Sequence, residues 1–325
     1  MKEKLVYISN ARIIGILLVV FGHSYPLTGE IPKALDTVRN FLYCFHMPLF
    51  VFISGYLVSK TGSVKKYGPQ QYIQKRFVKL FVPYFCLSAL GFLPKILMSG
   101  FINDEVEFSF TYFIRTHLVP RENVWGHFWF IPMLFVMAVV SVIYTKSVQK
   151  NRTLAIIMCI LSFGVIFMPV TTDWLGINDI KNYLFWYMSG LVIGDTGVFE
   201  RFKSVVTGMI CLACGLFVFV LCGTRAYNAF VALFMIVGII LLCMYIDLEN
   251  IKILNIIGKY SFPIFLLSWP AQVVVEVVGN RILHLPLVIN VTMMFLSGVV
   301  VPLIIVWIVK RLKNIPCMNK IQVIL

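Results

Sequence analysis

The sequence predicts an all-α fold, a polytopic transmembrane bundle of about ten helical spans, and three observations support this prediction. Of the 325 residues, 60% are hydrophobic and only 13% are charged. Soluble proteins average roughly 45–50% apolar and about 25% charged residues, so the apolar excess here must face lipid. The mean hydropathy is +0.90, and apolar stretches recur along the whole chain. We therefore expect residues 1–325 to form a single integral-membrane domain without a separate soluble domain.

Each apolar stretch is about as long as one crossing of the hydrocarbon core. The ten candidate spans are residues 8–26, 38–58, 78–99, 128–145, 153–170, 181–197, 204–223, 227–246, 258–279 and 287–309. The basic N-terminus before the first stretch resembles a signal peptide, but Arg12 interrupts the stretch and no small-residue cleavage site follows it. We expect it to remain in the protein as the first span.

The longest outer connector, about 100–127, leads into an aromatic cluster. Its members are Trp125, Phe128, Trp129 and Phe130. Aromatic rings of this kind favour the headgroup level of a bilayer. Two interpretations follow: a short interfacial element that covers the bundle, or a plain aromatic belt.

The basic excess, 28 Lys and Arg against 14 Asp and Glu, is better explained by membrane topology than by nucleic-acid binding, because little solvated surface is available for a basic groove. With the N-terminus inside, 19 basic residues fall on the cytoplasmic side and 8 on the outer side. The positive-inside rule then predicts that both termini are cytoplasmic and that the protein is a multi-pass protein of the cell membrane, in contact with membrane lipids.

No metal site is expected. Cys211 and Cys214 form a C-x-x-C pair, but the pair lies within a predicted span and no second pair accompanies it. We interpret both as packing residues.

Two ionisable residues in the first span are candidates for function, because charge within a bilayer is unfavourable. Arg12 and His23 are eleven residues apart, which places them on one helix face at a separation of about 16 Å. Gly15 and Gly22 border this stripe, so a neighbouring helix or a thin ligand can approach it closely. The alternative is that Arg12 snorkels to phosphates and His23 sits at the headgroups.

The second span repeats this pattern. Arg39 and His46 are seven residues apart, and Pro48 follows closely. Proline frees a backbone carbonyl, so we expect a kink around His46. His46 is either a hydrogen-bonded structural histidine or a participant in the chemistry.

A basic run enters the third span from the cytoplasmic side. Most such runs satisfy the positive-inside rule or bind anionic lipids. Arg76 in this run is also placed to hold a phosphorylated ligand with its bidentate guanidinium at the inner mouth.

In their order along the chain, these residues resemble the type-3 membrane acyltransferase family, integral-membrane enzymes that O-acylate bacterial sugars. The matching blocks are Arg12-Ile-Ile-Gly15 through Gly22-His23, Phe45-His46-Met47-Pro48-Leu49-Phe50 with Ser54-Gly55-Tyr56, Lys75-Arg76-Phe77 through Pro83-Tyr84, and Phe128-Trp129-Phe130-Ile131. A late family pattern ending in Tyr-Leu-x-His-x-Pro is altered, because Phe265 and Ser268 stand where the family has tyrosine and histidine. This change is expected to alter acceptor or acyl choice.

The resemblance implies an O-acyltransferase, most simply an O-acetyltransferase. Its donor would be cytoplasmic acetyl-CoA or another acyl-CoA, and its acceptor a hydroxyl of a carbohydrate or lipid-linked glycan of the envelope or of an exported glycan. Arg12 and Arg76 are the expected donor-binding residues, and His23 and His46 the expected catalytic ones. His23 is the favoured base, with His46 orienting it or contacting the acceptor. Direct transfer and an acyl-histidine intermediate both stay open.

The main alternative is a transporter or flippase for a glycan intermediate or small solute, in which the same Arg and His residues line a polar pathway. A sensor or scaffold without turnover is a third possibility. Consumption of acetyl-CoA by the purified protein would separate the enzyme from both.

Overall fold

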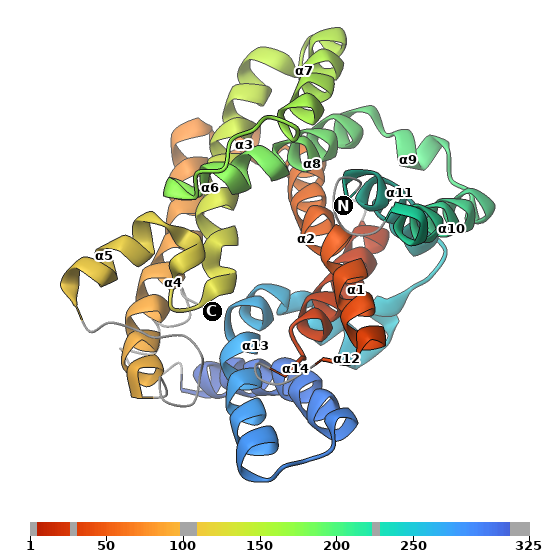
Figure 1. Cartoon of the computed structure of the whole chain (residues 1–325). Coiled ribbons are helices and arrows are strands. Elements are labelled where there is room, and N and C mark those ends of the chain that lie inside the picture. The colour runs from red at the N-terminus through yellow and green to blue at the C-terminus, as the bar shows by residue number, and fades with distance from the viewer. Residues whose placement is uncertain (1–4, 27–30, 98–108, 223–227, 313–325) are drawn as a thin grey trace. The chain divides into compact units, whose positions relative to one another are not determined.

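The computed structural model describes residues 5–26, 31–97, 109–222 and 228–312 (Figure 1). These residues form an all-α protein, and no strand occurs among them. The α-helices are α1 (Val6–Gly22), α2 (Lys33–Thr61), α3 (Ser63–Tyr67), α4 (Pro69–Leu97), α5 (Phe110–Leu118), α6 (Phe130–Ile143), α7 (Arg152–Val165), α8 (Ile177–Thr196), α9 (Val198–Arg201), α10 (Val205–Cys222), α11 (Asn228–Cys243), α12 (Lys252–Lys259), α13 (Ser261–Glu276) and α14 (Leu287–Arg311). The 3-10 turns are η2 (Pro120–Glu122), η3 (Gly126–Trp129), η5 (Trp174–Gly176) and η6 (Leu248–Asn250), and the π-helical turns are η4 (Tyr144–Val148) and η7 (Val277–Ile282).

Each predicted span overlaps at least one helix. Five segments are long and apolar enough to cross a membrane: Lys33–Thr61, Gly126–Val148, Val205–Cys222, Ser261–Asn280 and Leu287–Arg311. Shorter apolar helices lie at Val6–Gly22, Arg152–Val165 and Ala229–Cys243. The all-α membrane bundle is confirmed, and the number of about ten crossings stays a prediction.

One predicted span starts later than hydropathy suggests. Instead of one helix over 258–279, the short helix α12 ends at Lys259 and α13 begins at Ser261, with a non-helical backbone at Tyr260. Ile253 and Ile256 of α12 are exposed beside Lys252 and Lys259. This mixture of apolar and basic side chains is typical of a helix that lies at a membrane surface.

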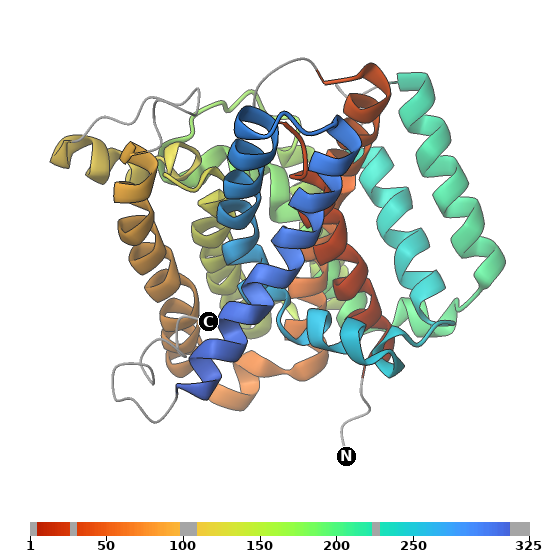
Figure 2. The ribbon, with the colours of Figure 1, turned by 90° about the horizontal axis from the view of Figure 1, so that it is seen from below.

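The chain divides into two compact units, residues 1–53 with 197–306 and residues 54–196 with 307–325. In the first unit, α1 packs against α11, α12 and α13, and α10 lies along α11 (Figures 1 and 2). Ala11, Ile13 and Ile16 of α1 are fully buried. In α10, by contrast, Val206 and Val220 are mostly exposed. Helix α1 is therefore central in this unit, whereas α10 presents an apolar face to lipid.

In the second unit, α6 packs against both α4 and α8, and α7 packs against α8. Asp195 near the end of α8 accepts hydrogen bonds from Tyr144 Oη at 2.7 Å and Gln149 Nε2 at 2.8 Å, and also from Ser59 at the end of α2. One carboxylate thus joins three helices of this unit, and the bonds satisfy its charge.

The predicted outer connector contains a helix, α5, in the part that the structure describes. Ser109 caps it by accepting a hydrogen bond from the backbone N–H of Tyr112. Phe110, Ile114 and Leu118 form an exposed apolar stripe at helical spacing, which fits an interfacial helix.

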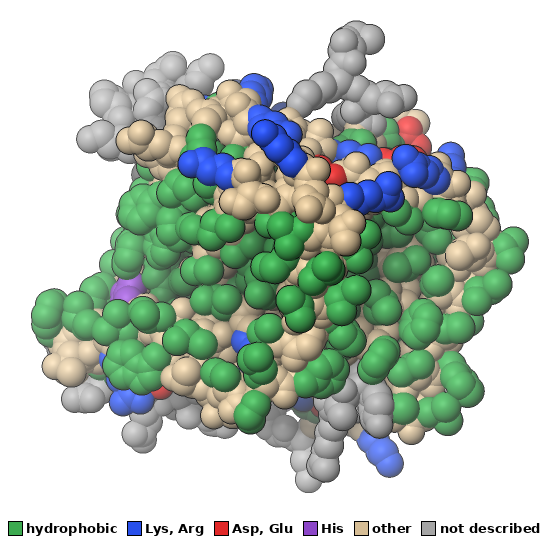
Figure 3. All heavy atoms as spheres, turned by 90° about the horizontal axis from the view of Figure 1, so that it is seen from above, with side chains coloured by type: hydrophobic (Ala, Val, Ile, Leu, Met, Phe, Trp, Pro, Cys, Tyr) green, Lys and Arg blue, Asp and Glu red, His purple; other side chains and the backbone are tan. Residues whose placement is uncertain are grey.

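The aromatic cluster is more than a belt, because Phe128 is fully buried. Hydrophobic side chains also cover much of the surface seen in Figure 3.

Candidate active site

The first unit contains three of the four predicted site residues. Arg12 lies within α1, His23 is the residue that ends α1, and His46 lies on α2. Arg76 lies on α4 in the second unit, so its cooperation with Arg12 stays a prediction.

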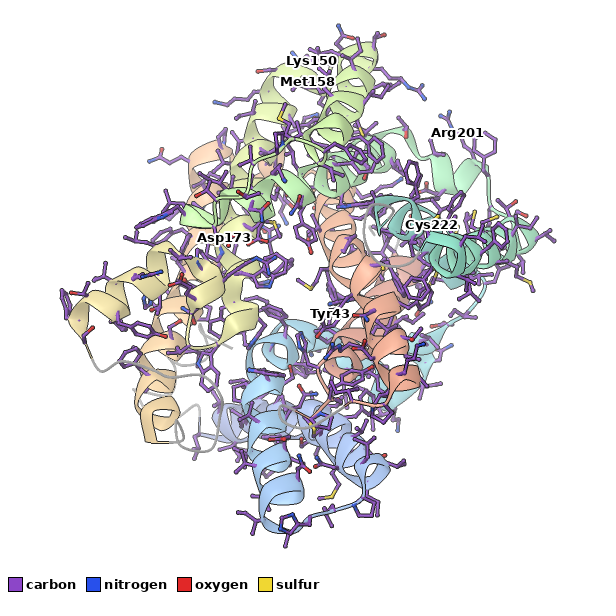
Figure 4. The ribbon with its side chains drawn as sticks, viewed as in Figure 1. Tyr43, Lys150, Met158, Asp173, Arg201 and Cys222 are labelled. Atoms are coloured by element: carbon purple, nitrogen blue, oxygen red, sulfur yellow. The ribbon has the colours of Figure 1, made fainter. Side chains whose placement is uncertain are left out.

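Tyr43 of α2 lies between the two histidines. Its ring centroid is 5.8 Å from that of His23 and 5.0 Å from that of His46. Its position on α2 is marked in Figure 4. The three rings form a continuous aromatic group that links the end of α1 to α2, which we call the His–Tyr–His group.

Hydrogen bonds within this group select the tautomer of His23. Tyr43 Oη donates to the backbone carbonyl of Gly22 at 2.8 Å and lies 3.3 Å from His23 Nδ1. Because the hydroxyl has one hydrogen and uses it for Gly22, His23 Nδ1 is the donor to Tyr43. The lone pair of the neutral imidazole is then on Nε2, where a base or nucleophile needs it.

His46 is oriented in the same way by its own helix. Its Nδ1 donates to the Leu42 carbonyl at 2.7 Å, so its Nε2 also carries the lone pair. The side chain is buried. Helix α2 continues through Pro48 as one element. A proline leaves the carbonyl four residues before it without a helical donor, here that of Cys44. His46 binds a different carbonyl, that of Leu42.

The glycine-bordered stripe of α1 faces α2, as the sequence predicts for a neighbouring helix. A Cβ atom on Gly22 would lie 3.1 Å from Tyr43 Cε1, and one on Gly15 would lie 3.0 Å from Phe50 Cε2. Larger residues at these positions would push Tyr43 and Phe50 away. The absence of a side chain at Gly22 therefore lets Tyr43 reach the backbone next to His23.

Helix α13 supplies a fourth ring to the site. Trp269 packs edge-on against His23, with ring centroids 5.3 Å apart. The preceding residue, Ser268, is buried. Ser268 is the position where the late family pattern has a histidine. The next residue in the sequence, Trp269, contacts His23.

Arg12 is half-buried, and its Nε is shielded from solvent without a hydrogen-bond partner among the described residues. Glu249 is the carboxylate near enough to interact with it electrostatically. A buried guanidinium N–H without a partner is unfavourable. A guanidinium N–H in this state can donate to an anionic group.

Arg76 differs from the other basic residues in its run. Its guanidinium carbon lies 5.2 Å from the centroid of the buried Tyr72 ring, and its side chain is half-buried. The neighbouring Lys75 is exposed and lies over the ring of Tyr67. Stacking on Tyr72 holds the planar guanidinium in one orientation.

The acyltransferase-3 family, whose description is "Acyltransferase domain", matches residues 5–311, nearly the whole chain. This chain belongs to that family. Nodulation protein NolL of Mesorhizobium japonicum is 27% identical over 212 residues, which are 62% of this chain and 52% of NolL. Inner membrane protein YcfT of Escherichia coli K12 is 24% identical over 293 residues, which are 82% of this chain and 79% of YcfT. The chain thus spans about half the length of NolL. No solved structure matches.

Two residues of the candidate site, Tyr43 and Trp269, were not singled out from the sequence. Tyr43 lies three residues before His46 and four after Arg39, so helical spacing alone places it on their common face. Trp269 carries no such signal, because its contact with His23 depends on the packing of α13 against α1.

Proposed function

We propose that this protein is a membrane O-acyltransferase that transfers an acyl group, most simply acetyl, from cytoplasmic acyl-CoA to a hydroxyl of an envelope or exported glycan. The observation that carries the proposal is the orientation of His23. Its Nδ1 is engaged by Tyr43, so Nε2 holds the lone pair needed for acyl transfer. Family membership supports the class of reaction.

In direct transfer, the acceptor oxygen bonds to the acyl carbon and the thioester C–S bond breaks. The hydroxyl proton moves to His23 Nε2 and from there to the departing sulfur of coenzyme A. Such a positioned base contributes about 10²–10⁴-fold to the rate. In the covalent alternative, Nε2 first bonds to the acyl carbon, and the C–S bond breaks to release the thiolate of coenzyme A. The acceptor oxygen then bonds to the acyl carbon as the C–N bond to the histidine breaks, and the hydroxyl proton is finally taken up by the thiolate.

His46 is assigned to positioning. Its ring packs against Tyr43 and its own Nδ1 is held by Leu42, so it holds Tyr43 in the orientation that supports His23. A residue in this role affects the rate through Tyr43 rather than by direct contact with the acyl group.

Donor binding is assigned to Arg12 and Arg76. The pyrophosphate of acyl-CoA needs cations, and Arg12 Nε makes no hydrogen bond among the described residues. From Arg12 to His23 is about 16 Å along α1, calculated from the helical rise. This length is of the order of a pantetheine arm, so a donor held at Arg12 would place its thioester near His23.

Replacement of Arg76 by lysine tests the donor site. Arg76→Lys keeps the charge but loses both the bidentate fork and the stacking on Tyr72. The Kd for acetyl-CoA, measured by calorimetry on protein in nanodiscs, should rise about tenfold or more, since one good charged hydrogen bond is worth about 1.5–3 kcal/mol. Lys66→Ala is the control, because Lys66 is exposed. Equal effects of the two changes would make Arg76 a topology determinant only.

The cell membrane is the proposed location, with several crossings and both termini cytoplasmic. The apolar helices and the similarity to an inner membrane protein support a membrane location. Lys65 and Lys66 of α3 and Lys75 at the start of α4 are exposed, which is consistent with the cytoplasmic side of the proposed topology.

The decisive assay uses purified protein in nanodiscs with acetyl-CoA. Release of coenzyme A, together with mass-spectrometric detection of acetylated glycan from the host envelope, would support the acyltransferase. Transport of a glycan intermediate without consumption of acetyl-CoA would favour the transporter or flippase instead.

A further inference from the structure

Three buried polar side chains lie on α13, whose Trp269 contacts His23, and on α14, the next helix along the chain. Gln272 and Glu276 on α13 are fully buried, and Asn290 near the start of α14 is 1% exposed. The two helices lie side by side in Figures 1 and 2. Polar groups in a membrane bundle are unfavourable and are found mainly where they serve a ligand, an ion or a proton.

Gln272 connects this polar group to the end of α1. Its Nε2 donates to the Val20 carbonyl and to Ser24 Oγ, both at 2.8 Å. Its Oε1 is buried and has no hydrogen-bond partner among the described residues. The amide is therefore fixed by its nitrogen, and its oxygen is left to accept a hydrogen bond.

Asn290 has no partner for either end of its amide within the described part of the chain. Both Oδ1 and Nδ2 are buried and make no hydrogen bond. A Cβ atom on Gly279 would lie 2.5 Å from Asn290 Oδ1, so only glycine fits opposite this amide. Each unsatisfied buried polar group costs about 1–3 kcal/mol.

A comparison within the same unit shows that Asn290 is exceptional. Asn10 is equally buried, yet its Nδ2 donates to the Cys243 and Ile246 carbonyls and its Oδ1 accepts from the Leu248 N–H. These hydrogen bonds explain why Asn10 is buried. Asn290 makes no such bonds among the described residues, so a leucine at this position would pack without leaving buried polar atoms unsatisfied.

Gln272, Glu276 and Asn290, which we call the polar group, adjoin the His–Tyr–His group through Gln272. Ser24 follows His23 in sequence, and Trp269, which contacts His23, precedes Gln272 by three residues, so both face α1. Beyond Glu276 the backbone becomes the π-helical turn η7, which ends where the N–H of Leu283 donates to the Val278 carbonyl. Isolated π-helical turns within helices are frequent at functional sites.

We infer that Gln272, Glu276 and Asn290 bind the hydroxyls of the acceptor sugar. This inference rests on the proposed function and assigns its acceptor side. The ligand class is a polyhydroxylated pyranose, since amide groups can both donate to and accept from adjacent hydroxyls, and a carboxylate can accept from them. Such a sugar would satisfy the Gln272 and Asn290 amides, and Trp269, three residues before Gln272, packs against His23.

The test uses the full-length protein in nanodiscs with four probes: glucose, galactose, mannose and N-acetylglucosamine. At least one should raise the Tm of the wild-type protein and accept acetyl from acetyl-CoA. Asn290→Leu should abolish the sugar-dependent Tm shift and raise the KM for that sugar at least tenfold, with the KM for acetyl-CoA changed less than twofold. Without sugar, its Tm should equal or exceed that of the wild type.

Met294→Leu is the matched control, because Met294 is fully buried one turn further along α14 and the change conserves volume. It should leave both KM values unchanged. An unchanged sugar KM in Asn290→Leu, or the absence of any sugar-dependent Tm shift in the wild type, would overturn the inference. A different result separates the two proposals. If acetyl-CoA is not consumed, but sugar raises the Tm of the wild type and not that of Asn290→Leu, the acyltransferase proposal fails and the sugar site stands.

Discussion

In the proposed mechanism, Tyr43 determines which nitrogen of His23 can act as a base. The tyrosine hydroxyl is committed to the Gly22 carbonyl, and His23 Nδ1 donates to the tyrosine oxygen. Without this oxygen, the proton could occupy either ring nitrogen and the ring could rotate. A fixed tautomer would keep the lone pair on Nε2, as the proposed reaction with a thioester requires.

Removal of this hydroxyl should therefore slow the reaction without unfolding the protein. Tyr43→Phe should lower kcat about 5- to 30-fold, corresponding to one or two kcal/mol of lost hydrogen bonding, with an unchanged KM for acetyl-CoA. Tyr25→Phe is the control, because the buried Tyr25 hydroxyl makes no hydrogen bond among the described residues. If both variants turn over at the wild-type rate, Tyr43 does not position His23.

The sequence could identify Arg12, His23 and His46, because charge and imidazole stand out within apolar spans. It could have identified Glu276 by the same argument, since this carboxylate lies within the predicted span 258–279. Asn290 and Trp269 could not be found in this way. An unsatisfied amide is recognised only when all its neighbours are known, and a ring contact between α13 and α1 depends on tertiary packing.

For whole helices, hydropathy was an accurate guide because the bilayer requires long apolar segments with internally satisfied backbones. All ten predicted spans correspond to helices. The break at Tyr260 was missed although Gly258 precedes it and Pro263 follows it, because apolar residues continue on both sides and hydropathy alone joins them into one span. Composition can locate a helix, but it does not show where the backbone turns.

The contacts of α1 with the end of α11 and with η6 depend on Asn10. Asn10→Leu leaves two carbonyls and one N–H without this partner. The free energy of unfolding should fall by about 2–3 kcal/mol, measured by thermal or denaturant unfolding in detergent. Asn290→Leu, at a position of similar burial, should show no loss. A destabilisation of similar size in both variants would mean that burial, rather than hydrogen bonding, distinguishes these positions.

For the whole molecule, the distribution of charge gives the proposed orientation. With both termini inside, 19 Lys and Arg lie on the cytoplasmic side and 8 outside. Such a bias is sufficient to set topology. The number of crossings and the single-domain organisation over residues 1–325 are predictions at this same scale.

Cysteine labelling can test the orientation directly. A single cysteine at position 66, on α3, should be protected from an impermeant thiol reagent added to intact cells, whereas one at position 105 should react. Position 105 lies outside the described residues. Labelling at position 66 in sealed cells would reverse the topology and with it the assignment of donor and acceptor sides.

The acyl-transfer assignment depends most directly on His23. Purified His23→Gln protein should bind acetyl-CoA with wild-type affinity and lose transfer by about 10²-fold or more, because glutamine keeps a hydrogen bond but cannot take a proton or an acyl group at neutral pH. Single-turnover transfer from radiolabelled acetyl-CoA measures both quantities in one preparation. Near-normal transfer by well-folded His23→Gln protein would contradict this mechanism and make His46 the next candidate for the base.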